Sequence, residues 1–163
     1  MPDDQATNND IKNRFCVSVE YLDGKWFEDH VFEVVDELAK DKGFIKDRQY
    51  GLSLKARKPN SKEFELDIFV LRGYQLIGIS ITTAGQQECK LKAFEVMHRI
   101  QQIGGDESRG ILIGMLNDDQ VKEMQMDISF LMTGANEEHF KAIGVDNWKK
   151  AKLKEELRRF IWQ

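Results

Sequence analysis

Apolar residues recur with two different periods along the chain, and each change of period marks a new element. A helical period of three to four residues begins at Trp26 and ends at Lys42-Gly43, which predicts a first helix. A period of two then predicts strands over residues 50–56 and 64–70, and a β-branched run predicts a third strand over residues 74–83. Three strands this close together in sequence indicate an antiparallel meander.

The helical period returns over residues 91–100 and stops at Gly104-Gly105, before a short apolar strand over residues 111–115. We expect this strand to lie parallel to the third one. Asn117 predicts the N-cap of a short helix over residues 121–126, followed by a weaker strand over residues 128–132. Two helices are predicted over residues 137–143 and 148–161. This order of elements indicates an α/β fold with a mixed central sheet flanked by helices.

Composition indicates one folded domain. With 163 residues, of which 41% are hydrophobic, the chain can bury one sizeable core. Residues 1–10 are acidic and polar and predict a disordered tail, so residues 11–163 form the expected domain. The N-terminus lacks a signal-peptide pattern, no apolar run approaches the roughly 18 residues that span a bilayer, and Cys16 and Cys89 have no metal-knuckle spacing. We therefore expect a cytoplasmic protein without a membrane segment.

Charge excludes a strongly basic protein, because 24 Lys and Arg face 28 Asp and Glu, a net charge of −4. Any cationic surface is therefore local. Residues 148–162 carry six Lys or Arg against two Glu, and Lys149, Lys150 and Arg158 are candidate nucleic-acid contacts. The alternative is the solvated face of a docked terminal helix. Arg72 and Arg109 are isolated basic residues that folding could bring together.

Candidate chemistry lies on the second and third predicted strands. Asp67 is on the second strand, and Ser80 and Thr82 form an i, i+2 pair on the third. A period of two places such a pair on one face of the sheet, and an acid beside it is a geometry that can hold a divalent metal. The alternative for Asp67 is an exposed or capping carboxylate at the rim of the sheet.

The order of these segments resembles the PD-(D/E)XK nuclease superfamily, and in particular the nuclease domain that CRISPR-associated ancillary effectors carry behind a CARF cyclic-nucleotide sensor. The resemblance covers roughly residues 24–132 and rests on Trp26-Phe27-Glu28, Glu65-Leu66-Asp67, Leu76-Ile77-Gly78-Ile79-Ser80-Ile81-Thr82-Thr83, Lys90-Leu91, Gly104-Gly105 and Gly110-Ile111-Leu112-Ile113. It implies a restriction-endonuclease-like fold with an α-βββ-αβ core. The residues before the first helix are too few for a sensor domain, so we expect the chain to work alone or with a separate sensor, or to share only its fold with the CRISPR-associated effectors.

The resemblance also implies roles for individual residues. Glu28 matches the helix Glu of the family, and Asp67 matches the strand Asp, its main metal ligand. Ser80 stands where the family has its metal-binding Glu, and Thr82 stands where it has Lys. Neutral hydroxyls supply neither the anionic ligand that Mg²⁺ prefers nor the cation that stabilises a phosphoryl transition state. The Glu-x-Lys motif is therefore degenerate.

A catalytic side chain of a nuclease fold can come from a neighbouring element while its functional group occupies the same place in the site. Glu88, Lys90 and Lys92 begin the helix after the third strand, from which a carboxylate or an ammonium could reach the same space. In that case Asp67 and Glu88, or Glu65, would bind Mg²⁺ or Mn²⁺. The alternative is that these residues are solvent-facing charges of a first helical turn.

Two main hypotheses of function follow. The first is a PD-(D/E)XK-fold domain that has lost catalysis and binds nucleic acid or a partner protein, in defence or nucleic-acid metabolism. The second is an active, metal-dependent DNA or RNA endonuclease with migrated catalytic residues. A third hypothesis is a self-associating scaffold, and a homodimer is compatible with all three.

Overall fold

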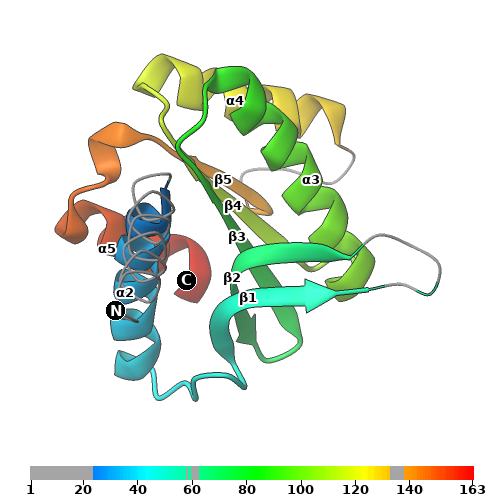
Figure 1. Ribbon diagram of the computed structural model, residues 1–163, viewed down its shortest axis with the longest axis vertical. Helices are drawn as coiled ribbons and strands as arrows, with labels where there is room; N and C mark the ends of the chain where they lie inside the picture. The colour runs from blue at the N-terminus through cyan, green and yellow to red at the C-terminus, as the bar shows by residue number, and fades with distance from the viewer. Residues whose placement is uncertain (1–23, 58, 60–62, 133–137) are drawn as a thin grey trace, which may run out of the picture.

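The computed structural model describes residues 24–57, 59, 63–132 and 138–163, and it contains a five-stranded sheet within these ranges (Figure 1). The strands are β1 (Tyr50–Ala56), β2 (Phe64–Arg72), β3 (Gln75–Thr82), β4 (Arg109–Gly114) and β5 (Phe140–Ile143). The helices are α2 (Trp26–Asp41), α3 (Gln86–Gly104), α4 (Asp118–Leu131) and α5 (Lys150–Trp162), with a 3₁₀ turn, η2 (Val145–Asn147), before α5.

The strands lie side by side in chain order, from β1 at one edge to β5 at the other. β1, β2 and β3 pair antiparallel as the predicted meander, and β3, β4 and β5 pair parallel, with Ile79 opposite Ile111. The helices α3 and α4 make the crossovers that parallel pairing requires. The predicted fold class, a mixed sheet flanked by helices, is confirmed, and this architecture is compatible with a nuclease-like α/β fold.

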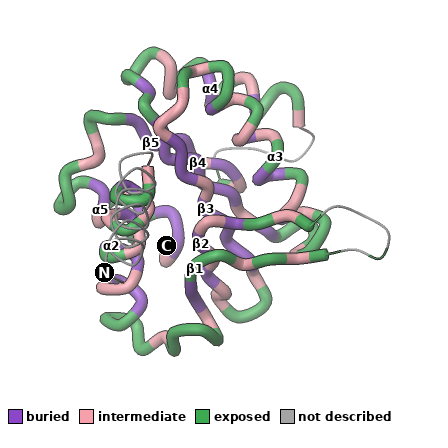
Figure 2. Tube along the Cα trace, in the orientation of Figure 1, coloured by how far each residue is buried: buried purple, intermediate pink, exposed green. Residues whose placement is uncertain are grey.

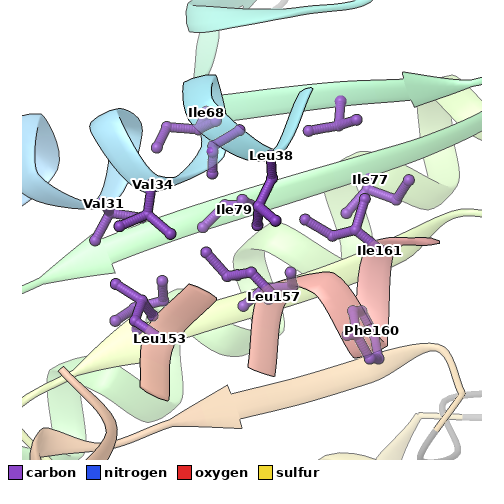
Figure 3. Close-up of a cluster of buried hydrophobic side chains, with 14 of the residues drawn as sticks. Val31, Val34, Leu38, Ile68, Ile77, Ile79, Leu153, Leu157, Phe160 and Ile161 are labelled. Atoms are coloured by element: carbon purple, nitrogen blue, oxygen red, sulfur yellow. The ribbon is translucent and has the colours of Figure 1, made fainter. Parts of the chain in front are cut away.

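One face of the sheet is covered by α2 and α5 (Figure 1). Apolar residues of α2 and α5 recur three or four positions apart, so each helix presents a single apolar stripe to the sheet. Figure 3 shows this core, in which Val31, Val34 and Leu38 of α2 and Leu153, Leu157, Phe160 and Ile161 of α5 surround Ile68, Ile77 and Ile79 of the strands. Burial of these side chains fixes the position of α5 on the sheet.

The other face is covered by α3 and α4, and here two glycines allow close packing. A Cβ added at Gly78 would lie 2.5 Å from Ile100 Cγ2, and one added at Gly110 would lie 2.5 Å from Met97 Sδ. Because glycine has no Cβ, α3 packs directly against the backbone of β3 and β4. The central strands are buried by helices on both sides (Figure 2).

Two predictions about the C-terminal half are wrong. The predicted strand over residues 128–132 belongs mainly to α4, which continues to Leu131 with Met124 and Ile128 buried four residues apart on one helical face. Its alternating apolar residues were misleading, because Phe130 is 87% exposed. The predicted helix over residues 137–143 contains β5 instead, because Phe140, Ala142 and Ile143 are buried beside β4. Four residues are too few for periodicity to separate strand from helix.

The predicted tail over residues 1–10, and the expected start of the domain near Ile11, lie outside the described residues. Within the described ranges, none of the helices has the length and apolar character needed to cross a membrane.

Candidate functional site

The candidate site lies where β2 separates from β3. Counted from the hairpin that joins β2 to β3, the last backbone pair between these two strands joins Ile68 to Ile79. In contrast, β1 and β2 stay paired as far as Ala56 and Phe64. Regular alternation would place Leu66 and Ile68 on the same face, but Leu66 packs with α3 and Ile68 with α2 and α5. The strand therefore changes face at Asp67, which lies between them.

The neighbouring strand contains a matching irregularity. Ser53 of β1 lies between the residues that pair with Leu66 and Ile68, and its φ of 58° is in the left-handed region. A non-glycine residue there is uncommon and marks a local departure from the strand conformation. The Ser53 hydroxyl also donates a hydrogen bond to Glu65 Oε1. β1 and β2 therefore bend together at the position of Asp67.

The Asp67 carboxylate takes the place of a backbone acceptor. Its Oδ2 accepts the Ile81 N–H at 2.7 Å and the Ser80 hydroxyl at 3.3 Å. Ile81 is two residues beyond the last β2–β3 pair, where continued pairing would have offered a carbonyl oxygen. A backbone N–H that would otherwise lack a protein partner is thus satisfied by a side chain.

Burial is the main influence on Asp67. It raises the pKa of the carboxyl above its usual value, since a desolvated carboxylate is less stable in its charged form. The Ile81 N–H, the Lys92 ammonium and the Ser80 hydroxyl act in the opposite direction on this pKa, and Glu65 raises it further. Lys92 is therefore the cation of α3 that acts on Asp67.

The two degenerate motif positions form local hydrogen bonds. Ser80 donates to Asp67, and Thr82 Oγ1 accepts the Ala84 N–H at 3.1 Å where β3 turns towards α3. Thr82 is buried, with 8% of its surface exposed. A hydroxyl bonded to a backbone group two residues on is a common turn arrangement. Thr82 therefore stabilises the turn that leads into α3.

The candidate residues at the start of α3 do not all face Asp67. Lys90 Nζ lies 2.5 Å from Asp127 Oδ2, so this lysine joins α3 to α4. Glu88 is exposed in the first turn of α3, and no hydrogen bond or ion pair joins it to another described residue. Of the three α3 candidates, only Lys92 acts on the Asp67 carboxylate.

Glu28 lies in the first turn of α2, and this turn starts close to the end of β3. A Cβ added at Gly24 would lie 3.4 Å from Thr83 Oγ1. Glu28 itself pairs with Lys25, with Lys25 Nζ 3.3 Å from Glu28 Oε2. Within the described part of the chain, its one ion pair therefore joins it to the N-cap residue of α2 and does not involve Asp67.

Few side chains that could bind a metal ion surround Asp67 in the described part of the chain. The described residues contain no group of three or more His, Cys, Asp or Glu that could hold a metal ion. Asp67 is a single carboxylate beside the neutral Ser80, and its Oδ2 is already bonded to the Ile81 N–H. Mg²⁺ prefers several oxygen ligands in octahedral geometry. What this arrangement does is hold β3 beside β2 at the point where they separate.

The candidate nucleic-acid contacts lie on α5 and in the segment before it. Lys150 Nζ pairs with Glu37 Oε1 at 2.6 Å and Glu33 Oε1 at 3.0 Å, so it joins α5 to α2. Lys149 and Arg158 are exposed, and neither forms an ion pair with a described residue. These two cations remain available to a polyanion. They are on the face covered by α2 and α5, whereas Lys92 is on the face covered by α3 and α4.

Three polar residues have structural roles that sequence reasoning did not assign. Arg72 Nη1 donates to Ile161 O and Arg109 Nη1 to Phe160 O, both at 2.8 Å, so two guanidinium groups cap the last carbonyls of α5. Gln125 of α4 donates to Phe140 O at 2.5 Å and accepts the Ala142 N–H at 3.0 Å. No local motif indicates these long-range contacts, because they depend on how the helices dock.

No protein-family model matches the chain, and no curated protein matches it in sequence. Solved structures do match. Protein VC1899 from Vibrio cholerae has a TM-score of 0.66 at 20% identity, over 86% of this chain and 34% of that one. Can2 from Sulfobacillus thermosulfidooxidans, solved in complex with cyclic tetra-adenylate, has a TM-score of 0.63 at 14% identity, over 88% of this chain and 38% of that one. At these identities the likeness shows a shared fold, and this chain spans little more than a third of either protein.

Proposed function

We propose that this chain is a nuclease-fold domain that binds nucleic acid and does not cleave it. The observation that carries the proposal is the use of Asp67 Oδ2 as the acceptor for Ile81 N–H. A catalytic metal ligand keeps its charge and its oxygens free for the ion. Asp67 Oδ2 instead accepts hydrogen bonds from β3, and the neutral Ser80 and Thr82 occupy the two motif positions.

Two observations support binding. Lys149 and Arg158 are exposed cations without ion-pair partners among the described residues, and Lys and Arg contacts to phosphate supply most non-specific affinity for nucleic acids. The fold is also shared with Can2, which was solved with cyclic tetra-adenylate, a cyclic oligonucleotide. Together with the PD-(D/E)XK resemblance, this likeness supports a role in CRISPR-associated defence.

The test combines binding and cleavage. The purified protein is incubated with single- and double-stranded DNA and RNA, with and without Mg²⁺ or Mn²⁺, and binding is followed by fluorescence anisotropy at two salt concentrations. We expect binding that weakens with salt, and intact substrates. Lys149→Ala with Arg158→Ala should weaken binding about tenfold, whereas the matched pair Lys55→Ala with Arg57→Ala, near the opposite edge of the sheet, should not. Equal affinity of both double variants would contradict a contact through α5.

A second candidate function is a Mg²⁺- or Mn²⁺-dependent nuclease with migrated catalytic groups. The observation in its favour is the charge of Lys92 acting on Asp67. Asp67 and Glu88 would then hold the metal, with Lys92 in place of the lysine missing at Thr82. Cleavage that is abolished by EDTA, by Asp67→Asn and by Lys92→Met would establish this function and refute the first. Cleavage unaffected by Asp67→Asn would indicate a contaminant.

We also propose that the domain self-associates as a homodimer. The motivation is the set of large apolar side chains exposed on α3 and α4, including Leu91 and Phe130, which are 70% and 87% exposed. Exposed apolar patches often mark interaction surfaces. Light scattering that reports a monomer at micromolar concentration would count against the dimer without affecting the proposal of nucleic-acid binding.

A further inference from the structure

A pocket of about 500 Å³ lies at the β5 edge of the sheet, and nothing in the proposed function uses it. Its walls come from α4, β4, β5 and α5, and its polar lining includes Arg109, Lys122, Gln125, Lys141 and Arg159. We call it the β5-edge pocket. Its volume is within the range of small-molecule sites, which is about 300–1,000 Å³.

Two of the lining side chains are fixed by their own hydrogen bonds. The side-chain amide of Gln125 forms hydrogen bonds to the backbone of β5 through both its nitrogen and its oxygen. Arg109 donates to Phe160 O, and its guanidinium lies 5.6 Å from the centre of the Phe160 ring. Part of the pocket wall is therefore in place before any ligand arrives, which reduces the entropy lost on binding.

The lining is also electrically unbalanced. It contains the four cations Arg109, Lys122, Lys141 and Arg159, but only two carboxylates, Glu138 and Glu156. Lys141 pairs with Glu156 at 3.1 Å, and Arg159 pairs with Glu155 at 3.0 Å. Lys122 forms no ion pair with any residue that the structure describes.

Partly exposed ion pairs of this kind contribute little to stability, so an anion can replace the carboxylate without a large loss. Burial lowers the pKa of Arg109, and the charge of Arg72 acts in the same direction, while Glu138 and Glu107 oppose it. An anionic ligand beside Arg109 would offset the cost of burying its charge. The pocket therefore favours a negative group over a neutral or positive one.

Apolar surface completes the pocket. Val121, Ala142 and Phe160 line it beside the cations. A bare inorganic anion would leave this surface in contact with water, whereas a ligand with an organic part would cover it. The combination of cations and apolar side chains is the one that recognises an organic phosphate.

We propose that the β5-edge pocket binds a phosphorylated small molecule. Lys122 of α4 and Arg159 of α5 line the pocket from two different walls and hold the phosphate, and the organic part lies against Val121 and Phe160. The proposal is independent of nucleic-acid binding, which uses Lys149 and Arg158.

Isothermal titration calorimetry on the full chain tests this site. The probes are adenosine 5′-monophosphate, ribose 5-phosphate, inorganic phosphate and adenosine. We expect both organic phosphates to bind, inorganic phosphate to bind at least tenfold more weakly, and adenosine to give no heat. The double variant Lys122→Ala with Arg159→Ala should weaken the organic phosphates about tenfold, whereas Lys55→Ala with Arg57→Ala should bind like the wild type.

Unfolding curves of both double variants show whether the fold is retained, so that a loss of affinity is assigned to the pocket. Absence of heat with every probe would overturn the proposal. So would equal affinity of the two double variants for the organic phosphates, which would place the site elsewhere. Inorganic phosphate that binds as tightly as adenosine 5′-monophosphate would also overturn it, because the organic part would then contribute nothing.

Discussion

Asp67 and Gln125 both stand where a strand lacks a neighbouring strand, but they complete the backbone hydrogen bonding in different ways. Asp67 lies where β2 leaves β3, and its single oxygen Oδ2 accepts one N–H. Gln125 lies beside β5, at the edge of the sheet, where its amide both donates to Phe140 O and accepts from Ala142 N. An amide thus reproduces both halves of a missing peptide unit, whereas a carboxylate reproduces only the acceptor.

The difference teaches how to interpret an acid at a strand junction. A carboxylate in that place is charged, partly desolvated and dependent on pH, which are also the properties of a catalytic group. An amide with an equivalent structural role has none of these properties, so the sequence does not mark it as a candidate functional residue. The hydrogen-bond partners therefore decide the role of Asp67, and a comparison of substitutions at the two positions can test it.

The largest effect is expected for Asp67→Ala. It leaves the Ile81 N–H without its acceptor, and an unsatisfied buried donor costs about 1–3 kcal/mol of the free energy of unfolding. Asp67→Asn keeps a carbonyl oxygen near the same place and removes the desolvated charge, so we expect a change below about 1 kcal/mol. Urea unfolding at neutral pH measures both variants.

Nucleic-acid affinity, measured on the same proteins, serves as the control. It should be the same for the wild type and Asp67→Asn, because the proposed contacts are Arg158 on α5 and Lys149 just before it. If the alanine and asparagine variants are equally destabilised, the N–H acceptor is not what Asp67 contributes. If both are as stable as the wild type, Asp67 has no structural role and its catalytic interpretation gains weight.

The next effect is expected for Gln125→Ala, which removes both bonds at the edge of β5. The loss should be about 1 kcal/mol, because the edge lies near solvent and water replaces part of the hydrogen bonding. An uncapped edge strand also offers its backbone to another chain, so the variant should self-associate more than the wild type. Urea unfolding and light scattering measure the two consequences.

Gln125→Glu sharpens this prediction. It retains an acceptor for the Ala142 N–H but brings a carboxylate towards Phe140 O, so it should destabilise at least as much as alanine. The exposed Gln102 of α3, replaced by Ala, provides a control away from the edge. Unchanged stability and unchanged association of Gln125→Ala would mean that the edge is protected by other groups.

Periodicity was sufficient for the parts of the fold in which one face of an element is buried. The apolar residues of α2 repeat every three to four positions, those of β1 and β2 follow a period of two in the sequence, and a β-branched run marks β3, so both helix and meander follow from the sequence. It failed for β5, which has four residues, and at the end of α4, where exposed Phe130 and Leu131 imitate a strand. At these places tertiary contacts decide the conformation, and a local pattern contains no information about them.

For the candidate site, the sequence indicated which elements carry Asp67 and Ser80, and folding brings these two side chains within hydrogen-bonding distance. It could not indicate that β2 changes face at Asp67, or that Lys90 turns to Asp127 while Lys92 acts on Asp67. Lys90 and Lys92 are the same type of residue and lie only two positions apart in the sequence. The rotation of α3 on the sheet separates their roles.

A third prediction concerns pH. Burial raises the pKa of Asp67 in the folded chain above its usual value of 3.8, so the folded state binds this proton more tightly than the unfolded state. The contribution of Asp67 to stability is then fully present below pH 3.8 and is lost as pH rises through the folded-state pKa. The free energy of unfolding of the wild type, minus that of Asp67→Asn, should therefore fall as pH rises from about 3.8.

Urea unfolding of both proteins between pH 3 and pH 7 provides this difference, and the other carboxyl groups cancel in it. Glu65→Gln removes a neighbouring charge that raises the pKa of Asp67. In the Glu65→Gln background, the difference in the free energy of unfolding should therefore fall at lower pH. A difference that rises with pH would show that the folded state prefers the carboxylate, as a salt-bridged or metal-binding acid does.

The smallest effect is expected for Ser80→Ala. The Ser80 hydroxyl lies 3.3 Å from Asp67 Oδ2, a longer contact than the 2.7 Å bond from Ile81 N. Since the Ile81 N–H keeps its acceptor, the free energy of unfolding should change by less than about 0.5 kcal/mol. The hydroxyl lowers the pKa of Asp67. Its loss should therefore shift the fall of the Asp67 contribution to the free energy of unfolding to higher pH. A loss as large as that of Asp67→Ala would show instead that Ser80, and not the Ile81 N–H, fixes the carboxylate.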